Sequence, residues 1–170
     1  MYGSIPFSLR NQYEAVLETL RYVIEECPEK EWNEPHGDYP FSQVVFHALF
    51  YADFYLCADP AEFRQQEYHR RKPDFFQDYE ELEDRLPVHL YDRHDIMDYL
   101  EFCMNKADRV TSAETVESLE EFSGFERRLF SRGELHIDNI RHIQHHAAQL
   151  GLRLQLITGK EMPWFSTGKR

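Results

Sequence analysis

The sequence predicts an all-α protein, a four-helix bundle with a long connection between its second and third helices. Apolar residues recur at helical spacing in four segments, at about 8–27, 41–58, 92–111 and 133–158. No segment of useful length alternates apolar and polar residues as a strand does, and no internal repeat is visible. The long segment between the second and third helices would permit a crossover topology instead of simple up-and-down order.

The first two predicted helices have recognisable ends. Ser8 is the expected N-cap of the first helix, and Pro28 follows its expected end. In the second helix Ser42 is the expected cap, and Asp59-Pro60 ends the helix or opens a short helical turn. The first helix has one apolar face, formed by Leu9, Tyr13, Val16, Leu17, Leu20, Val23 and Ile24.

The last two predicted helices are delimited in the same way. The third begins near Asp92, and residues 115–122 either extend it or form a short separate turn. Ser131 and Glu134 resemble a capping box, so the fourth helix should begin near residue 133, and Gly159 is placed to end it. Its apolar stripe includes a histidine and consists of Leu135, Asn139, Ile143, His146, Leu150, Leu154 and Ile157.

Residues 59–92 form the least regular part of the chain. Pro60, Pro73 and Pro87 interrupt it, and charged side chains crowd at 80–85, which we expect to be a solvated face. Short helical turns are expected here, because a structureless loop of this length is unusual in a compact domain. A crossing connection within a single domain of residues 1–170 is therefore favoured over a second domain.

Composition restricts the partners and the location of the protein. The chain has 31 acidic and 19 basic residues and a formal net charge of −12, which disfavours nucleic acids and anionic membrane surfaces. No stretch approaches the ~20 apolar residues of a membrane helix, and no signal peptide is visible. Cys27, Cys57 and Cys103 occur singly, as in a reducing compartment. We expect a cytoplasmic protein that acts on a small-molecule substrate.

The most informative segment is residues 141–150, which contain three histidines within five positions. His142 and His146 are four residues apart, so they project from nearly the same helix face, one turn apart. Each neutral imidazole offers one lone pair to a divalent ion. His145 is rotated by ~100° from His146 and is expected to face another helix or solvent. A ligand pair of His142 and His145, three apart, is left open as an alternative.

A metal site in a bundle also needs a ligand from a facing helix, and His47 is the best candidate. It lies in the middle of the second predicted helix, on its apolar side. Three histidines leave at least one coordination position open, as in sites that activate water or bind a substrate atom. Imidazole donors suit Zn²⁺, Ni²⁺, Cu²⁺ and Fe²⁺ and do not suit Mg²⁺ or Ca²⁺.

Each of these positions also has a structural interpretation. A histidine on an apolar helix face is more often a hydrogen-bonded core residue than a ligand. Asp138, four residues before His142, could accept an imidazole N–H or simply favour the helix dipole. Tyr51, one turn after His47, could line a pocket or fill core volume. The remaining histidines are expected at the surface or pointing elsewhere: His36, His69, His89, His94 and His136.

These residues resemble the DinB-like (YfiT-like) superfamily of metal-binding four-helix bundles. The characteristic pattern is a histidine in the second helix, here His47, and a terminal H-x-x-x-H before a Gly/Ala-Gln-Leu stretch, here from His142 to Leu150. A Pro-Trp after the last helix, here Pro163-Trp164, is a further similarity. The chain departs from the common His-Arg-Gly-Gln form after His146, and its 59–92 connection is longer than in the shortest members.

The resemblance implies a crossover bundle, often a homodimer, with one divalent ion, zinc or nickel, held by His47, His142 and His146. Some relatives are thiol S-transferases that use low-molecular-weight thiols such as bacillithiol or mycothiol, and others resemble hydrolases. We therefore expect a metal-dependent enzyme of one of these types, with metal-bound water or thiolate as the reactive group. The alternative is a non-catalytic helical bundle that binds a ligand or protein and has structural histidines.

Overall fold

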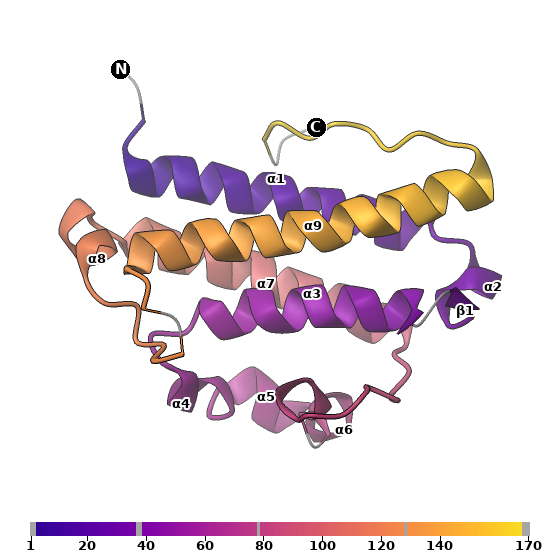
Figure 1. Cartoon of the computed structure of the whole chain (residues 1–170), viewed down its shortest axis with the longest axis horizontal. Helices are drawn as coiled ribbons and strands as arrows, with labels where there is room; N and C mark the ends of the chain where they lie inside the picture. The colour runs from indigo at the N-terminus through magenta and orange to yellow at the C-terminus, as the bar shows by residue number, and fades with distance from the viewer. Residues whose placement is uncertain (1–2, 37–38, 78, 128, 168–170) are drawn as a thin grey trace.

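The structure is a computed structural model that describes residues 3–36, 39–77, 79–127 and 129–167. It is mostly helical, which confirms the predicted all-α class. The longest described helices are α1 (Ile5–Glu26), α3 (Phe41–Tyr55), α7 (Arg93–Ala113) and α9 (Arg132–Thr158). Both α1 and α3 pack against α7 and α9, so α1 lies diagonally across from α3 (Figure 1).

Interhelical contacts fix the directions of these helices. His136, near the start of α9, is hydrogen-bonded at 3.0 Å to Tyr13 in the first half of α1, and Lys160, just after α9, donates to Glu26 at the end of α1. The two helices therefore run the same way. Arg93, at the start of α7, donates to the carbonyl oxygen of Ile24 near the end of α1, so α7 runs oppositely. Helix α3 runs in the same direction as α7 (Figure 1). The two helices that carry the candidate histidines, α3 and α9, are therefore antiparallel neighbours.

Two predicted caps are wrong and two are confirmed. The N-cap of α1 is Ser4, whose side chain accepts from the backbone N–H of Phe7, and Ser8 lies inside the helix. Ser42 is buried within α3 and donates to Asn33, while Pro40 precedes the helix. Ser131 caps α9 through the backbone N–H of Glu134, and Gly159 ends α9 with a φ of 73°, a left-handed conformation that glycine adopts without strain.

The long connection contains short helices, as predicted. These are α4 (Pro60–Phe63), α5 (Glu67–Arg71), α6 (Pro73–Phe76) and the 3₁₀ turn η1 (Glu80–Leu82), and they form a layer across α3 from α1 (Figure 1). The remaining elements are α2 (Glu29–Trp32), α8 (Val116–Glu120) and an antiparallel pair of two-residue strands, β1 (Pro35–His36) and β2 (Tyr39–Pro40). None of the described helices combines the length and apolar character that a membrane span requires.

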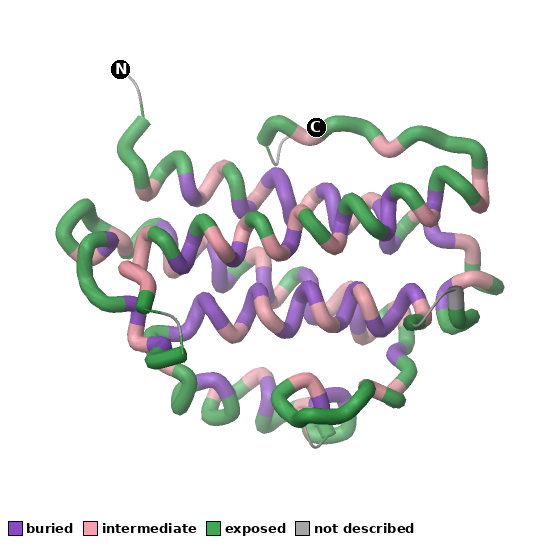
Figure 2. Tube along the Cα trace, in the orientation of Figure 1, coloured by how far each residue is buried: buried purple, intermediate pink, exposed green. Residues whose placement is uncertain are grey.

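The core lies between the long helices and extends under the connection. Buried positions follow the inward faces of α1, α3, α7 and α9, and they continue into α4 and α6 (Figure 2). Helix α3 is covered on most sides, because the connection packs on the face that the other long helices leave open. Aromatic rings fill that second interface, among them Phe46, Phe50, Phe63, Phe75, Phe76 and Tyr99.

A buried carboxylate at Asp53 joins the connection to the long helices. One of its oxygens accepts from His69 Nε2 at 2.7 Å and from Tyr99 OH at 2.9 Å, while the other accepts from Gln66 and from the Lys106 ammonium. Burial alone would raise the pKa of Asp53, but the hydrogen bond from His69 and the Lys106 charge hold it below its usual value. The prediction that His69 is solvated is wrong, because its side chain is fully buried here.

Removing the charge of Asp53 should destabilise the protein strongly. In Asp53→Asn the Lys106 ammonium stays buried without its counter-charge, and we expect a loss of about 3–5 kcal/mol in the free energy of unfolding. Lys106→Met alone leaves the carboxylate uncompensated and should cost a similar amount, while the double variant should recover much of the loss. Urea unfolding of all four proteins measures the coupling, and additive losses in the double variant would contradict a direct ion pair.

Candidate metal centre

The structure brings together the three histidines that the sequence singles out. His142 Nε2 lies 3.2 Å from His47 Nε2 and 3.2 Å from His146 Nε2. Nitrogen atoms of all three rings lie within 4.8 Å of one another, and they are the one such group of metal-ligating side chains among the described residues. Each histidine is half-buried. The cluster forms because His47 sits mid-way along α3 and faces the middle of the antiparallel α9.

Hydrogen bonds at the far side of two rings orient their lone pairs toward the cluster. His47 Nδ1 lies 2.7 Å from Oε2 of Glu81, and a carboxylate accepts but does not donate, so Nδ1 carries the proton and Nε2 keeps a lone pair. His146 Nδ1 lies 2.9 Å from Oε1 of Gln149 and is oriented in the same way. Two lone pairs therefore point at His142 Nε2, which carries one proton at most.

This arrangement fits a divalent ion. Zinc–nitrogen bonds of about 2.0–2.1 Å at a tetrahedral angle place ligand nitrogens roughly 3.3–3.4 Å apart. The two distances of 3.2 Å from His142 Nε2 are close to this value. Burial, followed by the nearby His47 ring, lowers the pKa of His146 to about 4, so this imidazole is neutral at pH 7 and its lone pair is available. A neutral imidazole is the form that binds a metal.

The side chains expected around the cluster differ in their positions. Tyr51 contacts two of the histidines, with its ring centroid 4.9 Å from that of His47 and 5.5 Å from that of His142. His145 is exposed and touches only the edge of the cluster, with its ring 5.1 Å from that of His146. Asp138 is half-buried one turn before His142. The geometry thus favours His146 over His145 in the trio.

Sequence reasoning missed Glu81, because it treated residues 80–85 as a solvated face. Glu83 and Asp84 are exposed as expected, but the Glu81 side chain is 5% exposed and faces His47. Glu80 is also turned inward and accepts from two backbone N–H groups at the end of the connection. That interpretation is therefore wrong for the first two residues of the run. No apolar spacing within the run signals this, since Leu82 is itself exposed.

Two hydrogen bonds and one unusual backbone conformation set the position of Glu81. The backbone carbonyl of Glu81 accepts from Tyr51 OH at 2.9 Å, which attaches η1 to α3 beside the cluster. Tyr79, immediately before η1, has a left-handed φ of 57° and a hydroxyl 3.1 Å from His69 Nδ1. A non-glycine residue in this region costs about 1 kcal/mol or more and persists only where its surroundings require it. The Asp53 network thus extends through His69 and Tyr79 to the residue that orients His47.

A cavity of about 360 Å³ opens beside the cluster. His47 and His146 line it together with Tyr51, Glu81 and Gln149, while His142 lies behind them. An ion held by three histidines would have an open coordination position that a small molecule in this cavity could reach. A separate cavity lies between α7 and α4, and none of the three histidines lines it.

Comparison of the chain with protein-family models, with curated proteins and with solved structures gives no match. The class of site is therefore defined by its own residues, as a three-histidine cluster between antiparallel helices beside a cavity.

Loss of the Glu81 charge should weaken metal binding without unfolding the protein. The carboxylate orients His47 and increases the basicity of its Nε2, and removing such a partner typically lowers metal affinity by about 10–100-fold. Glu81→Gln should show this decrease in zinc affinity, measured by competition with a chromophoric chelator. Glu83→Gln is the matched control, because it removes the same charge two residues away on an exposed side chain. Equal affinities in the two variants would contradict the orienting role.

Proposed function

We propose that this protein is a divalent-metal protein of the DinB-like type, a four-helix bundle with a crossover connection. The observation that carries the proposal is the convergence of three imidazole Nε2 atoms, two of them 3.2 Å from the third, with lone pairs oriented inward. The helix arrangement supports it, since α1 and α9 run one way and α3 and α7 the other, with the long connection between α3 and α7. One domain spanning the chain and a cytoplasmic location are parts of the same proposal.

His47, His142 and His146 would hold the ion, with zinc or nickel favoured by the all-imidazole donor set. When bound, the ion would act as a Lewis acid on a thiol or a water molecule, for thiol transfer or for hydrolysis. The protein's own residues have defined tasks around it. Glu81 and Gln149 fix the two rings that line the cavity, and Tyr51 lines the same cavity beside His47.

Partial exposure of the cluster favours a reactive site over a purely structural one. Core histidines in this protein are fully covered, as His69 and His136 show with 2% and 1% exposure. His47, by contrast, has a side chain that is 33% exposed and borders a cavity. Both kinds of histidine have hydrogen-bond partners, so burial and the cavity distinguish them. A small-molecule substrate, with a low-molecular-weight thiol as a candidate cosubstrate, suits a cavity of this size.

Metal analysis tests the proposal directly. Untagged protein should contain or take up close to one equivalent of zinc or nickel, and His47→Ala, His142→Ala and His146→Ala should each lower the affinity by at least about 100-fold, since two ligands bind a divalent ion far more weakly than three. His145→Ala is the matched control and should leave the affinity within about twofold, because its ring is exposed beside the trio.

Two results would overturn the metal proposal. The first is wild-type protein that stays metal-free after dialysis against zinc and nickel. The second is an equal loss of affinity in all four histidine variants. Either outcome would favour the alternative of a non-catalytic binding module with structural histidines.

A bound ion should also raise the melting temperature of the protein as the metal concentration increases, because it binds the folded state preferentially.

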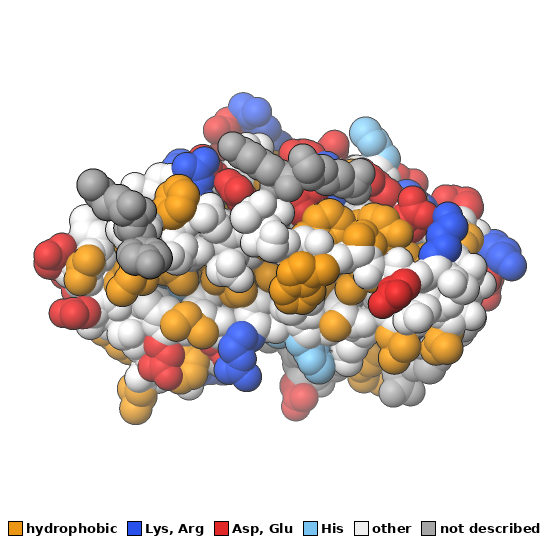
Figure 3. Space-filling view, turned by 90° about the horizontal axis from the view of Figure 1, so that it is seen from above, with side chains coloured by type: hydrophobic (Ala, Val, Ile, Leu, Met, Phe, Trp, Pro, Cys, Tyr) orange, Lys and Arg blue, Asp and Glu red, His pale blue; other side chains and the backbone are white. Residues whose placement is uncertain are grey.

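A homodimer is also part of the proposal, and exposed apolar side chains on the outer face of α9 support it. Ile137, Leu152 and Leu156 are 54%, 57% and 78% exposed. Viewed from above α1 and the C-terminal segment, hydrophobic side chains gather across the middle of the face, with charged ones mainly around its edge (Figure 3). Light scattering should give twice the chain mass, and Leu152→Glu with Leu156→Glu should give a monomer. A monomeric wild type would contradict this.

A further inference from the structure

A second cavity, of about 920 Å³, adjoins the histidine cluster. It shares Tyr51, Glu81 and Glu83 with the smaller cavity that His47 and His146 line. From these shared residues it extends past the end of α3 toward the segment at 124–127. A molecule with one end at the histidines could therefore lie along both cavities, with Tyr51 at the junction.

One wall of this second cavity is aromatic. Tyr51, Phe54, Tyr55 and Phe125 line it, and their ring centroids lie 5.1–6.2 Å apart in the pairs that touch. Phe125 and Tyr55 are buried at 4% and 9% exposure, which fixes their rings. Rigid aromatic faces bind apolar groups, and they also attract cations through the ring quadrupole.

The charged residues of the lining are mainly acidic. The described lining residues include five carboxylates and one guanidinium, namely Asp59, Glu81, Glu83, Asp84 and Glu126 with Arg127. Glu83 is paired with Arg85, Asp59 caps α4, and Glu81 binds His47. Asp84 and Glu126 are exposed at the rim. Carboxylates and aromatic rings in one cavity are the chemistry that recognises organic cations.

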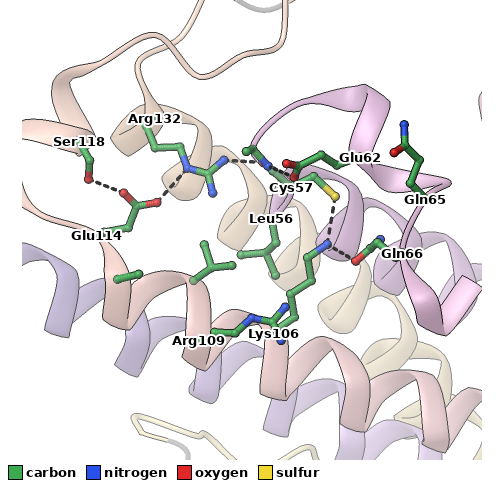
Figure 4. A pocket seen from close by; sticks show the side chains of 13 residues that line it. Leu56, Cys57, Glu62, Gln65, Gln66, Lys106, Arg109, Glu114, Ser118 and Arg132 are labelled. Carbon is green, nitrogen blue, oxygen red and sulfur yellow. Dashed lines mark hydrogen bonds and ion pairs between the residues drawn. The ribbon is translucent and has the colours of Figure 1, made fainter.

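The acidic lining is local and does not simply reflect the net charge of −12. The cavity between α7 and α4, of about 560 Å³, is lined by Lys106, Arg109 and Arg132 against Glu62 and Glu114 (Figure 4). Figure 4 shows Lys106 directed toward Cys57 and Gln66, and Arg132 toward Glu114. Basic side chains therefore gather at one cavity and acidic ones at the other.

We propose that the second cavity, of about 920 Å³, takes an organic cation, an ammonium group attached to an apolar or aromatic body. The cationic body lies against Tyr51, Tyr55 and Phe125 with Asp84 and Glu126 at its rim, and the reacting group extends past Tyr51 to the histidines. This inference rests on the proposed function, because it names the substrate class of that same site. It also disfavours an anionic substrate or cosubstrate there.

Binding of simple probes tests the inference without knowledge of the reaction. Benzyltrimethylammonium should bind at least about tenfold more tightly than benzyl alcohol, which corresponds to a cation–π and carboxylate contribution of ~1.4 kcal/mol. Benzenesulfonate should not bind detectably. Isothermal titration at roughly physiological salt limits the contribution of distant charges. NMR shifts of the Tyr51, Tyr55 and Phe125 rings locate the probe.

Charge-neutral variants distinguish the effect of carboxylates at the cavity from the effect of the protein's overall charge. Asp84→Asn with Glu126→Gln should weaken benzyltrimethylammonium by about fivefold, as expected for two exposed carboxylates. Asp74→Asn with Glu120→Gln removes the same charges from exposed positions outside the lining and should change the affinity by less than about 1.5-fold. Phe125→Leu should also weaken the cation. Because that variant removes a buried ring, the rim variants decide the outcome if it fails to fold.

The failure of this inference is distinguishable from the failure of the metal proposal. His142 does not line the second cavity, so His142→Ala should bind the cation as the wild type does while losing the metal. Cation preference in a protein that binds no metal would refute the metal proposal and leave the cavity assignment standing. Normal metal binding with equal affinity for cation and alcohol, or with equal effects of both double variants, would overturn the organic-cation site.

Discussion

One buried carboxylate, that of Asp53, determines how the connection lies against the helices. A carboxylate without exposed surface is tolerated only when donors and counter-charge surround it, and here they come from α5, through His69, and from α7, through Tyr99 and Lys106. The same network continues through Tyr79 to η1, which delivers Glu81 to His47. The histidine cluster therefore depends on a group that does not touch it. Two rigid helices supply the three imidazoles, and the connection supplies the acceptor that orients one of them.

Because the site lies between the two helices and the connection, its histidines are half-buried, whereas the core histidines His69 and His136 are fully buried. Helices α3 and α9 pack closely enough to bring three Nε2 atoms together, and the connection that packs along α3 leaves a cavity beside His47 and His146. Tyr51 and Glu81 line both this cavity and the larger one next to it. Hydrogen bonds to Glu81 and Gln149 leave the inward nitrogens as acceptors, an arrangement that is costly without a cation among them.

The helices and the pair of His142 and His146 could be predicted from the sequence because both follow from residue spacing within a helix. His47 was selected because it lies mid-way along the apolar side of the second helix. Periodicity located α1, α3, α7 and α9 to within a few residues, and an interval of four placed His142 and His146 on one face. Glu81 and His69 could not be predicted in this way. Their partners, His47 and Asp53, lie 34 and 16 residues away, and the path of the connection between them is set by packing. A dense run of charged residues such as 80–85 is expected to be solvated, because the sequence does not show that folding places the His47 imidazole against Glu81. Ser8 was expected as the cap, whereas α1 begins earlier, with Ser4 as its N-cap and Pro6 in its first turn, a position that suits proline.

Charge placement connects the overall acidity of the chain with the proposed substrate. The net charge of −12 would repel any anion at long range. Two basic side chains form ion pairs within the protein, Lys106 with Asp53 and Arg132 with Glu114. These basic side chains line a cavity that contains none of the three histidines, whereas carboxylates predominate in the cavity next to the cluster. A low-dielectric cleft lined by one sign of charge focuses the field and raises the local concentration of the opposite ion. The acidity that disfavours nucleic acids thus also favours a cationic substrate at the histidine site, and an anionic thiol would have to enter against the same field.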